Sequence, residues 1–422
     1  MMAIDRNTSI LIVGAGTFGL STAYHLAKAG YRNITVLEKS PSMPPDLSAA
    51  NDLNKIVRAE YEDPFYTHLA LEAIREWQTT ELFVPHFHQT GYLLCTSSTA
   101  PEKSRHTLAQ SLSSISSHPA FCDQIEPIQS RDDIRRVAPV FDGPMNWKGY
   151  FNRLAGYAHS ADALRAIYVA CGSLGVNVQL GVTVKSLLFD DNVCTGVKTN
   201  TNHEYRADCT VLALGASLPS VLSTAGKQMS ARAWSVGHIQ LTSDEAASLH
   251  GIPVTYARDL GFFFEPDAHT NLLKICPAGG GYTNFTYLDP GSRAQEVSIP
   301  PKNNSWIPPH DEAKIRNLLH DTLPELAARP IIHKKLCWCI DTADSEYVID
   351  SVPGCRNLVV VAGDSGHAFK MLPIAGRWVR QLLEQDGLQT VDRWRWKDGQ
   401  GASGDISWRV GQSTDLKDLG IF

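Results

Sequence analysis

The sequence lacks the long apolar and strongly basic segments that mark membrane-spanning and nucleic-acid-binding proteins. No run of about 18 apolar residues occurs, so no segment is long enough to cross a bilayer as a helix. At pH 7 the formal net charge is −6, from 38 basic and 44 acidic residues. A chain of net negative charge has no overall attraction to nucleic acid or to an anionic membrane. We therefore expect neither of them as a partner.

Targeting signals and a disulfide framework are also missing. The apolar stretch near the N-terminus ends after residues 10–13, where glycines interrupt it, and no small-residue cleavage site follows. The C-terminal residues 418–422 do not form an S-K-L-type peroxisomal signal. The 9 cysteines are an odd number at irregular spacings, which is typical of a reduced, intracellular protein. The expected location is the cytoplasm.

What the chain does contain is a strand, glycine-turn and helix pattern at three places. Residues 9–38 read as a βαβ unit, and residues 207–216 and 357–384 each begin with a buried strand and a glycine turn. Residues 226–300 hold several short strand-like segments separated by turn signals, which is typical of antiparallel structure. We therefore predict an α/β protein in which a Rossmann-like dinucleotide-binding domain (1–80, 154–222 and 333–422) is interleaved with a mostly antiparallel α+β substrate domain (81–153 and 223–332).

A G-x-G-x-x-G motif follows the first predicted strand. Gly14 permits a tight turn, Gly16 lets the backbone approach a pyrophosphate, and Gly19 allows the helix to pack closely on the strand. Glu38 ends the next strand, where an acidic residue binds the ribose hydroxyls. The motif predicts a dinucleotide site and by itself leaves FAD and NAD open. Further contacts are expected at the helix start, after Glu38, and in two segments that close over the cofactor in flavin-type folds: Thr17, Phe18, Lys39, Val184 and Gly215.

Two cysteines one residue apart, Cys337 and Cys339, lie in an apolar run followed by acidic and polar residues, LCWCIDTADSEYVID (336–350). A zinc site needs four ligands, usually from paired C-x₂-C motifs, and no second pair is nearby, so we expect no metal. A redox dithiol favours C-x-x-C near the start of a βαβ unit. From these residues alone, ordinary buried thiols and an anchor for a covalent cofactor both stay open.

Several longer segments carry a resemblance to one enzyme family: NDLNKIV (51–57), GFFFEPD (261–267), LKIC (273–276), CWCIDTADSEYVID (337–350) and SGHAFKMLPIAG (365–376). With them the chain resembles the fungal amadoriases (fructosyl amino acid oxidases) and, more distantly, monomeric sarcosine oxidase and pipecolate oxidase. The resemblance implies a glutathione-reductase-like fold of the D-amino acid oxidase and sarcosine oxidase type, FAD as cofactor, and a monomer. It also implies that Cys337 carries a thioether bond to the flavin 8α-methyl group, with Cys339 as the alternative.

The resemblance further implies roles for several cations. The family oxidises the C–N bond of secondary amines and returns the electrons to O₂, which leaves as hydrogen peroxide. Lys274 matches a lysine that contacts flavin N5 through water, and Lys55 matches a basic residue near the flavin. Arg58 lies where sarcosine oxidase binds a carboxylate, and Lys370 matches a substrate-binding lysine, so we expect the two to clamp an α-carboxylate. Tyr61 is a candidate pocket wall.

The remaining flavin contacts come from the same motifs. The loop 363–366 is expected to lead into a helix whose N-terminal amides face the flavin. The residues expected to contact the cofactor here are Ser48, Asn54, Lys55, Asp364, Gly366 and Lys370.

One position departs from the amadoriases. They place an acidic residue after the LKIC motif to hold the sugar hydroxyls, whereas this chain has Ala278, which cannot accept such a hydrogen bond. The expected substrate is therefore an N-alkylated α-amino acid with a sizeable side chain. The amadoriase-like enzymes of isoquinoline alkaloid biosynthesis suggest an N-methyl aromatic amino acid that cyclises on oxidation. Fructosyl amino acids, saccharopine, pipecolate and N-methylglycine stay open as substrates.

Two other classes compete with an amine oxidase. One is a dehydrogenase that passes electrons to an acceptor other than O₂, against which Lys274 argues. The other is a flavoprotein without enzymatic activity.

Overall fold

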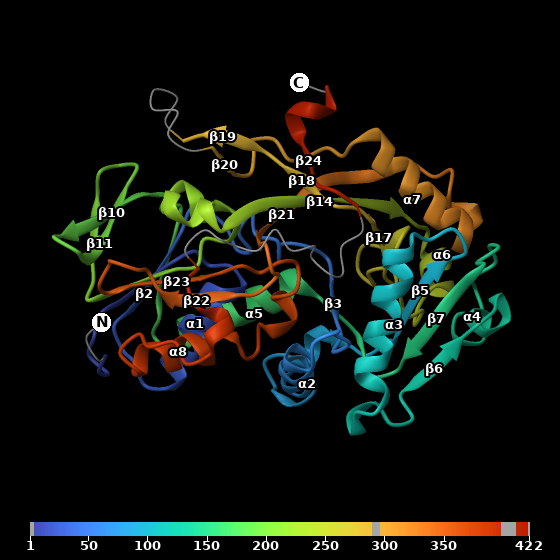
Figure 1. Cartoon of the computed structure of the whole chain (residues 1–422), viewed down its shortest axis with the longest axis horizontal. Coiled ribbons are helices and arrows are strands. Elements are labelled where there is room, and N and C mark those ends of the chain that lie inside the picture. The colour runs from blue at the N-terminus through green and yellow to red at the C-terminus, as the bar shows by residue number, and fades with distance from the viewer. Residues whose placement is uncertain (1–3, 289–295, 398–410, 421–422) are drawn as a thin grey trace.

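The computed structural model describes residues 4–288, 296–397 and 411–420, which form two lobes (Figure 1). The strands β14 (Met229–Gln240) and β21 (Ile332–Thr342) pair with each other and run across the junction between the lobes. The α-helices of this part of the chain are α1 (Thr17–Lys28), α2 (Pro64–Thr79), α3 (Glu102–Ser116), α4 (Arg131–Val137), α5 (Ser160–Ser173), α6 (Ser243–Ser248), α7 (Pro309–Thr322) and α8 (Ala375–Glu384).

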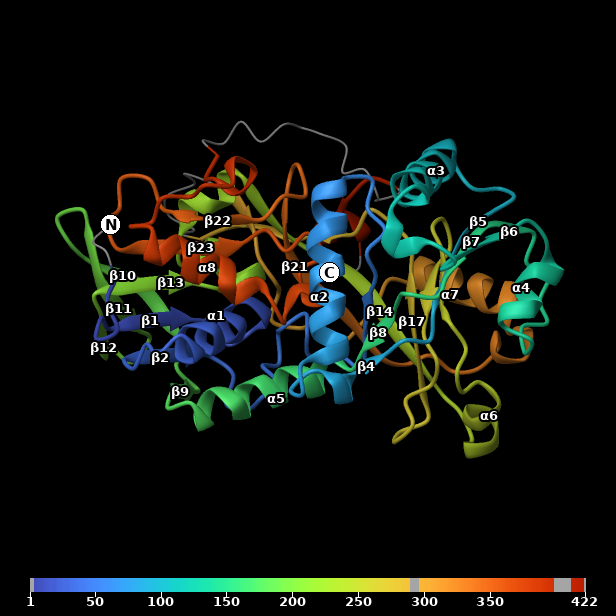
Figure 2. The same cartoon turned by 90° about the horizontal axis from the view of Figure 1, so that it is seen from below.

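The first lobe is built on a sheet in which all pairings are parallel except that of its edge strand β22; the strand order is β22 (Val348–Ser351), β23 (Leu358–Ala362), β13 (Cys209–Leu212), β1 (Ile10–Val13), β2 (Ile34–Glu38) and β9 (Asn177–Leu180). Along β1, Ile10 and Ile12 pack in one core cluster, and Leu11 and Val13 in another. A strand buried on both faces needs apolar residues throughout, which explains its sequence ILIV. Helix α1 packs against both α5 and α8, and the three lie together in Figure 2.

The second lobe is built on a larger, mostly antiparallel sheet, in which β21 joins the path by pairing with β14. Its strand order is β24 (Thr414–Asp415), β18 (Tyr282–Thr283), β14, β17 (Leu272–Pro277), β16 (Gly261–Phe263), β15 (Val254–Ala257), β5 (Tyr92–Ser97), β7 (Trp147–Asn152) and β6 (Ile125–Ile128). Helices α3, α4, α6 and α7 belong to this lobe, as Figure 1 shows.

Three smaller sheets and short 3₁₀ helices complete the described part. The small sheets are β10 (Val184–Asp190), β11 (Val193–Thr199) and β12 (Glu204–Arg206); β3 (Lys55–Val57), β8 (Gly156–Ala158) and β4 (Phe87–His88); and β19 (Phe285–Tyr287) with β20 (Glu296–Ser298). The 3₁₀ helices are η1 (Val84–His86), η2 (Pro119–Phe121), η3 (Gly215–Ser220), η4 (Ser223–Lys227), η5 (Pro324–Leu326), η6 (Phe369–Met371), η7 (Asp392–Trp394) and η8 (Leu416–Leu419).

The predicted α/β architecture, a Rossmann-like sheet interleaved with a mostly antiparallel one, is confirmed. The chain leaves the second sheet for the first between β21 and β22. The division into residues 1–80, 154–222 and 333–422 against 81–153 and 223–332 stays a prediction. Within the described residues, no helix is both long and apolar enough to traverse a membrane.

Candidate active site

One cavity of about 430 Å³ is lined by residues of both lobes. It extends from the carboxyl ends of β1 and β2 to β17 and β21. Of the predicted site residues, those that line this cavity are Gly14, Gly16, Thr17, Phe18, Glu38, Lys39, Ser48, Lys55, Arg58, Tyr61, Val184, Gly215, Lys274, Ala278, Cys337, Asp364, Gly366 and Lys370. Gly19 and Asn54 are not on its wall.

The glycine turn between β1 and α1 forms one end of the cavity. Gly14 has a φ of +107°, and a Cβ atom there would lie 2.3 Å from the Ala213 carbonyl oxygen, so the turn requires glycine. A Cβ atom at Gly19 would lie 1.8 Å from the Gly14 carbonyl oxygen. Gly19 therefore serves helix–strand packing and faces the turn instead of the cavity.

Glu38 lines this end of the cavity, and its carboxylate accepts hydrogen bonds from two backbone N–H groups. One carboxylate oxygen accepts the N–H of Ala15 at 2.9 Å and the other accepts the N–H of Ser40 at 2.9 Å. The neighbouring Lys39 donates to the hydroxyl of Ser217 at 2.8 Å, which links β2 to η3. The acidic side chain is thus held rigidly at the end of its strand.

Three lysines surround one buried carboxylate at the other end of the cavity. Oδ2 of Asp52 lies 2.6 Å from Nζ of Lys274 and 2.7 Å from Nζ of Lys55, and Oδ1 lies 3.6 Å from Nζ of Lys335. Lys274 is 1% exposed, which excludes a solvent-facing strand lysine. It also donates to the carbonyl oxygen of Asn54 at 2.6 Å, so Asn54 holds this lysine from behind the wall.

The charges in this cluster shift the pKa values of their neighbours. Burial alone would raise the pKa of the Asp52 carboxyl, but the three lysines hold it well below its usual range. Burial lowers the pKa of Lys274 in spite of the attraction of Asp52. Burial acts in the same direction on Lys55, but there Asp52 together with Cys337 and Cys276 outweighs it, and the pKa is raised. One permanently ionised carboxylate thus offsets part of the charge of several ammonium groups.

Arg58 and Lys370 meet at the ring of Tyr61. The guanidinium carbon of Arg58 lies 5.0 Å and Nζ of Lys370 lies 5.1 Å from the ring centre, and Lys370 donates to the tyrosine hydroxyl at 2.8 Å. In the described part of the chain, neither cation forms an ion pair with a carboxylate, and Nη1 of Arg58 is buried without a hydrogen-bond partner. Burial and the charge of Arg58 hold the pKa of Lys370 well below its usual range. Such a pair is suited to bind an anion.

His367 lies on the same wall and fixes the hydroxyl of Tyr61. Its Nε2 lies 2.9 Å from the Ser345 carbonyl oxygen, so Nε2 carries the hydrogen and Nδ1 accepts. Nδ1 is 3.0 Å from the hydroxyl of Tyr347 and 3.2 Å from that of Tyr61. Burial lowers the pKa of His367 to about 3, so the ring is neutral. Tyr61 can therefore donate to His367 while it accepts from Lys370.

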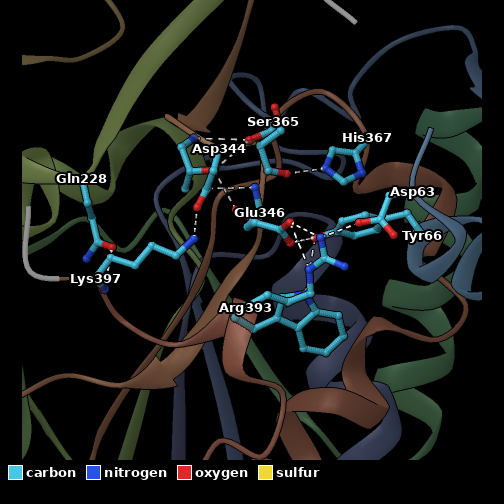
Figure 3. Close-up of polar contacts among 12 residues, drawn as sticks. Asp63, Tyr66, Gln228, Asp344, Glu346, Ser365, His367, Arg393 and Lys397 are labelled. Atoms are coloured by element: carbon cyan, nitrogen blue, oxygen red, sulfur yellow. Dashed lines mark hydrogen bonds and ion pairs between the residues drawn. The ribbon is translucent and has the colours of Figure 1, made fainter. Parts of the chain in front are cut away.

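An ion-pair network behind this wall ties η7 to the turn between β21 and β22 (Figure 3). Nη2 of Arg393 lies 2.5 Å from Oδ2 of Asp63 and 2.6 Å from Oε1 of Glu346. The hydroxyl of Tyr66 donates to Glu346 at 2.5 Å. Because the same turn carries Ser345, the network holds the carbonyl group that orients the neighbouring imidazole.

The rest of the wall is largely apolar and aromatic. It includes Trp234, Tyr256, Phe262 and Phe264, together with Ala278. The methyl group of Ala278 offers no hydrogen-bond acceptor at this position, where the amadoriases are expected to have an acidic residue.

The loop 363–366 does not lead directly into a helix that faces the cavity, contrary to the expectation. The short η6 follows the loop. Pro373 then interrupts the helical structure, and α8 begins only at Ala375. The N–H of Gly376 donates to the hydroxyl of Ser21 in α1 at 2.8 Å. The first turn of α8 therefore packs on α1, and the cavity wall is formed by residues 364 and 366–370 instead.

Comparison with known proteins identifies the family. A sequence model described as "DAO: FAD dependent oxidoreductase" matches residues 9–382. The chain belongs to this family. It is 35% identical over 431 residues to the L-saccharopine oxidase of Schizosaccharomyces pombe, covering 97% of this chain and 98% of that protein.

Comparison with solved structures agrees with this assignment. The fold is similar to that of the deglycating fructosamine oxidase Amadoriase II from Aspergillus fumigatus, with a TM-score of 0.90, 34% identity, and coverage of 99% of this chain and 97% of that one. It is also similar to the fructosyl peptide oxidase from E. terrenum, with a TM-score of 0.91, 33% identity, and coverage of 99% and 98%. The predicted membership of the amadoriase and sarcosine oxidase group is confirmed. The protein is an FAD-dependent oxidase of amines or amino acids that acts on CH–NH groups.

The residues at the glycine end of the cavity fit the FAD of the DAO family. The N-cap of α1 is Gly16, which has no capping side chain, so the first N–H groups of this helix are available to a pyrophosphate. Val184 and Gly215 line the adjoining wall, and Gly215 has a φ of +50°. These residues would hold the dinucleotide part of FAD along this wall.

Cys337 and Cys339 lie on the same face of β21, because side chains two residues apart in a strand point the same way. Cys337 is half-buried, and its sulfur lies 3.6 Å from Nζ of Lys55, on the side of the lysine cluster. Cys339 is buried, and its sulfur lies 3.7 Å from a carboxylate oxygen of Asp341. Cys337 is therefore in contact with Lys55, one of the predicted catalytic lysines.

Two residues with prominent positions were missed by the sequence analysis. Asp52 lies three residues before Lys55, but its other cations come from β17 and β21, so sequence spacing gave no sign of the cluster. Arg258 is 3% exposed and lines the cavity. The only feature of the sequence that could have indicated Arg258 is its position directly after the buried strand β15.

Proposed function

We propose that this protein oxidises the C–N bond of a secondary-amine α-amino acid, with O₂ as the electron acceptor. The observation that carries the proposal is the pair Arg58 and Lys370, two cations without a carboxylate partner in the described part of the chain, on the wall that also holds Lys274. An α-carboxylate between them would accept hydrogen bonds from both groups. That anchor would fix the amine and the carbon next to it in one orientation.

FAD, when bound, accepts the hydride from the carbon beside the amine and delivers the electrons to O₂. The protein supplies the electrostatics: Lys274 and Lys55 hold positive charge where negative charge develops during both half-reactions. Asp52 keeps these ammonium groups in place. We propose that the enzyme acts as a monomer in the cytoplasm.

An N-methyl aromatic amino acid is one proposed substrate. The wall of Trp234, Tyr256, Phe262 and Ala278 supports it, because aromatic and apolar side chains can pack on an aromatic ring. Oxidation of the N-methyl group would give an iminium, which an electron-rich ring captures with formation of a C–C bond.

Saccharopine is the second proposed substrate. The relative from Schizosaccharomyces pombe, similar over nearly the whole chain, is an L-saccharopine oxidase. Saccharopine is also a secondary amine with an α-carboxylate that the pair Arg58 and Lys370 would bind. A fructosyl amino acid is less suitable, because Ala278 offers its hydroxyl groups no acceptor.

The test mixes the FAD-loaded enzyme anaerobically with N-methyl-tyrosine, saccharopine and fructosyl-valine in separate experiments. We expect loss of the oxidised flavin absorption with the first two and not with fructosyl-valine, and hydrogen peroxide once O₂ is admitted. Reduction by none of these secondary amines would overturn the proposal. Reduction by fructosyl-valine alone would make the protein a deglycating enzyme.

We also propose that the flavin is attached to Cys337. The thioether bond replaces the S–H bond and one C–H bond of the 8α-methyl group, and the two electrons and two protons end in hydrogen peroxide. Its position beside Lys55 supports Cys337 over Cys339. Denatured wild-type protein and Cys339→Ser should keep the flavin with a mass increase of FAD less two hydrogen atoms, whereas Cys337→Ser should lose it. Flavin retained by Cys337→Ser and lost by Cys339→Ser would reverse the assignment.

A further inference from the structure

Arg258 is a buried cation that the α-carboxylate site described above does not use. Its Nη2 donates to the hydroxyl of Ser111 at 2.7 Å. Its Nε and Nη1 are buried and have no hydrogen-bond partner among residues 4–288, 296–397 and 411–420. The carboxylate of Glu62, which accepts from the hydroxyl of Ser111 at 3.2 Å, forms an ion pair with Nη1 at 3.6 Å, beyond hydrogen-bond distance. Buried guanidinium groups normally have their donors satisfied, so these two donors indicate a missing acceptor.

Three tyrosines, Tyr92, Tyr150 and Tyr256, lie on the same face of the sheet as Arg258. Tyr256 and Tyr150 both pair with Leu94 from opposite sides, so their side chains share one face. Arg258 lies two residues after Tyr256, and its N–H continues the ladder by donating to the carbonyl of residue 95 at 2.9 Å. Tyr92 lies two residues before Leu94, so it also shares this face. The hydroxyl groups of Tyr92 and Tyr150 are buried without a hydrogen-bond partner in the described part of the chain.

The α-carboxylate site and Arg258 belong to one polar region. Burial raises the pKa of both Tyr92 and Tyr150, and the charges of Arg58 and Arg258 both act on each of them in the opposite direction. The fully buried carboxylate of this region, Glu60, is already occupied, since it accepts from the side chain of Asn152 at 2.7 Å and from the N–H of residue 59 at 3.0 Å.

We propose that Arg258, which lines the cavity, binds a second carboxylate of the substrate, and that the hydroxyl groups of Tyr92 and Tyr150, which lie off the cavity wall, add to this site. The proposal rests on the amine oxidase function and narrows its substrate to N-alkylated amino acids of the dicarboxylic type. One carboxylate would lie at Arg58 and Lys370, and the second would accept hydrogen bonds from Arg258. This arrangement favours a saccharopine-like substrate over an N-methyl aromatic amino acid.

The test compares N-methyl-L-glutamate with N-methyl-L-glutamine, which has nearly the same shape and lacks the second charge, and with N-methyl-L-norvaline. Anaerobic flavin reduction gives the affinity of each compound for the FAD-loaded enzyme. We expect wild type to prefer the glutamate compound over the other two by about tenfold to a hundredfold. In Arg258→Met this preference should disappear, while the affinity for the norvaline compound stays within about threefold of wild type. No preference in wild type, or a preference retained by Arg258→Met, would overturn the proposal.

Two controls separate a structural defect from a loss of binding. Arg258→Met also loses the bond to Ser111, so Tyr92→Phe and Tyr150→Phe are tested beside it, because they remove only a hydroxyl group. Each should weaken binding of the glutamate compound by about threefold to tenfold and leave the norvaline compound unchanged. If both variants bind the two compounds like wild type, the tyrosines are excluded from the site.

A binding measurement without turnover distinguishes this proposal from the proposed function. Glutarate and butyrate are titrated into the FAD-loaded protein, and the shift of the flavin spectrum is followed. Tighter binding of glutarate that is lost in Arg258→Met supports the second carboxylate site even if no amine reduces the flavin. Equal binding of the two acids, together with flavin reduction by monocarboxylic amines, overturns the second site and leaves the proposed function intact.

Discussion

Two groups of cations in and next to the cavity differ in their carboxylate partners. In the first group, three lysines gather around Asp52, whose carboxylate contacts two of them at 2.6 and 2.7 Å. In the second group, Arg58 and Lys370 have no carboxylate partner in the described part of the chain, and Arg258 has Glu62 only at 3.6 Å. A buried cation whose carboxylate partner is distant or missing is costly, and a bound anion offsets this cost. The first group is therefore suited to hold a permanent charge and the second to bind an anion.

The largest expected effect comes from removal of the shared carboxylate. Asp52→Asn leaves Lys274 and Lys55 buried beside each other without their counter-charge. We expect the free energy of unfolding to fall by about 3–5 kcal/mol, measured by urea denaturation of the FAD-loaded protein. The control is Asp344→Asn, because that carboxylate is about one-third exposed and pairs with Lys397; its loss should cost about 1 kcal/mol or less. Equal losses in the two variants would contradict the role of Asp52.

The next effect concerns the reaction with O₂. Lys274→Met removes the most deeply buried ammonium group of the first group, and we expect reoxidation of the reduced flavin to slow by about a hundredfold to a thousandfold. Stopped-flow mixing of the reduced enzyme with O₂ measures this rate. Lys335→Met is the matched control, since its ammonium group is 3.6 Å from Asp52 and does not line the cavity. A similar slowing in both variants would show that the total charge matters and not the position of Lys274.

The second group should make ligand affinity depend on pH. The pKa of Lys370 is depressed in the free protein by burial and by Arg58, and a bound carboxylate raises it. At a pH above the depressed pKa of Lys370, binding of a carboxylate is therefore coupled to uptake of a proton by this lysine. The affinity for the carboxylate then falls with rising pH by up to about tenfold per pH unit. Titrations of glutarate at several pH values, followed by the flavin spectrum, measure this slope. Lys370→Arg should abolish the slope because arginine stays charged; an unchanged slope would assign the titration to another group.

The smallest effect is expected outside the cavity. Arg393 is about one-third exposed and pairs with Asp63 and Glu346 (Figure 3). We expect Arg393→Met to lower the free energy of unfolding by about 1 kcal/mol and to leave the rate of flavin reduction unchanged. Urea denaturation and anaerobic stopped-flow measurements test the two statements. A large loss of activity would mean that the position of His367 depends on the turn that carries Ser345, and that Arg393 holds this turn in place.

The dinucleotide end of the cavity could be predicted well from the sequence. Its glycine turn lies within one short stretch of the chain, and the backbone conformation at Gly14 and the close contact at Gly19 both follow from the spacing of one motif. The position of α8 was predicted less well, because Pro373 and the packing of Gly376 on α1 separate the helix from the loop 363–366. A glycine loop followed by a helical pattern does not reveal that separation.

By itself, the sequence determined the fold class, the dinucleotide-binding motif and several of the residues that line the cavity. Only the tertiary structure decided which charges are paired. The partners of Asp52 come from β3, β17 and β21, and Arg258 comes from a turn after β15, so their distances depend on how two sheets meet. The physical reason is that a motif fixes local backbone geometry, whereas the compensation of a buried charge depends on side chains far apart in the chain.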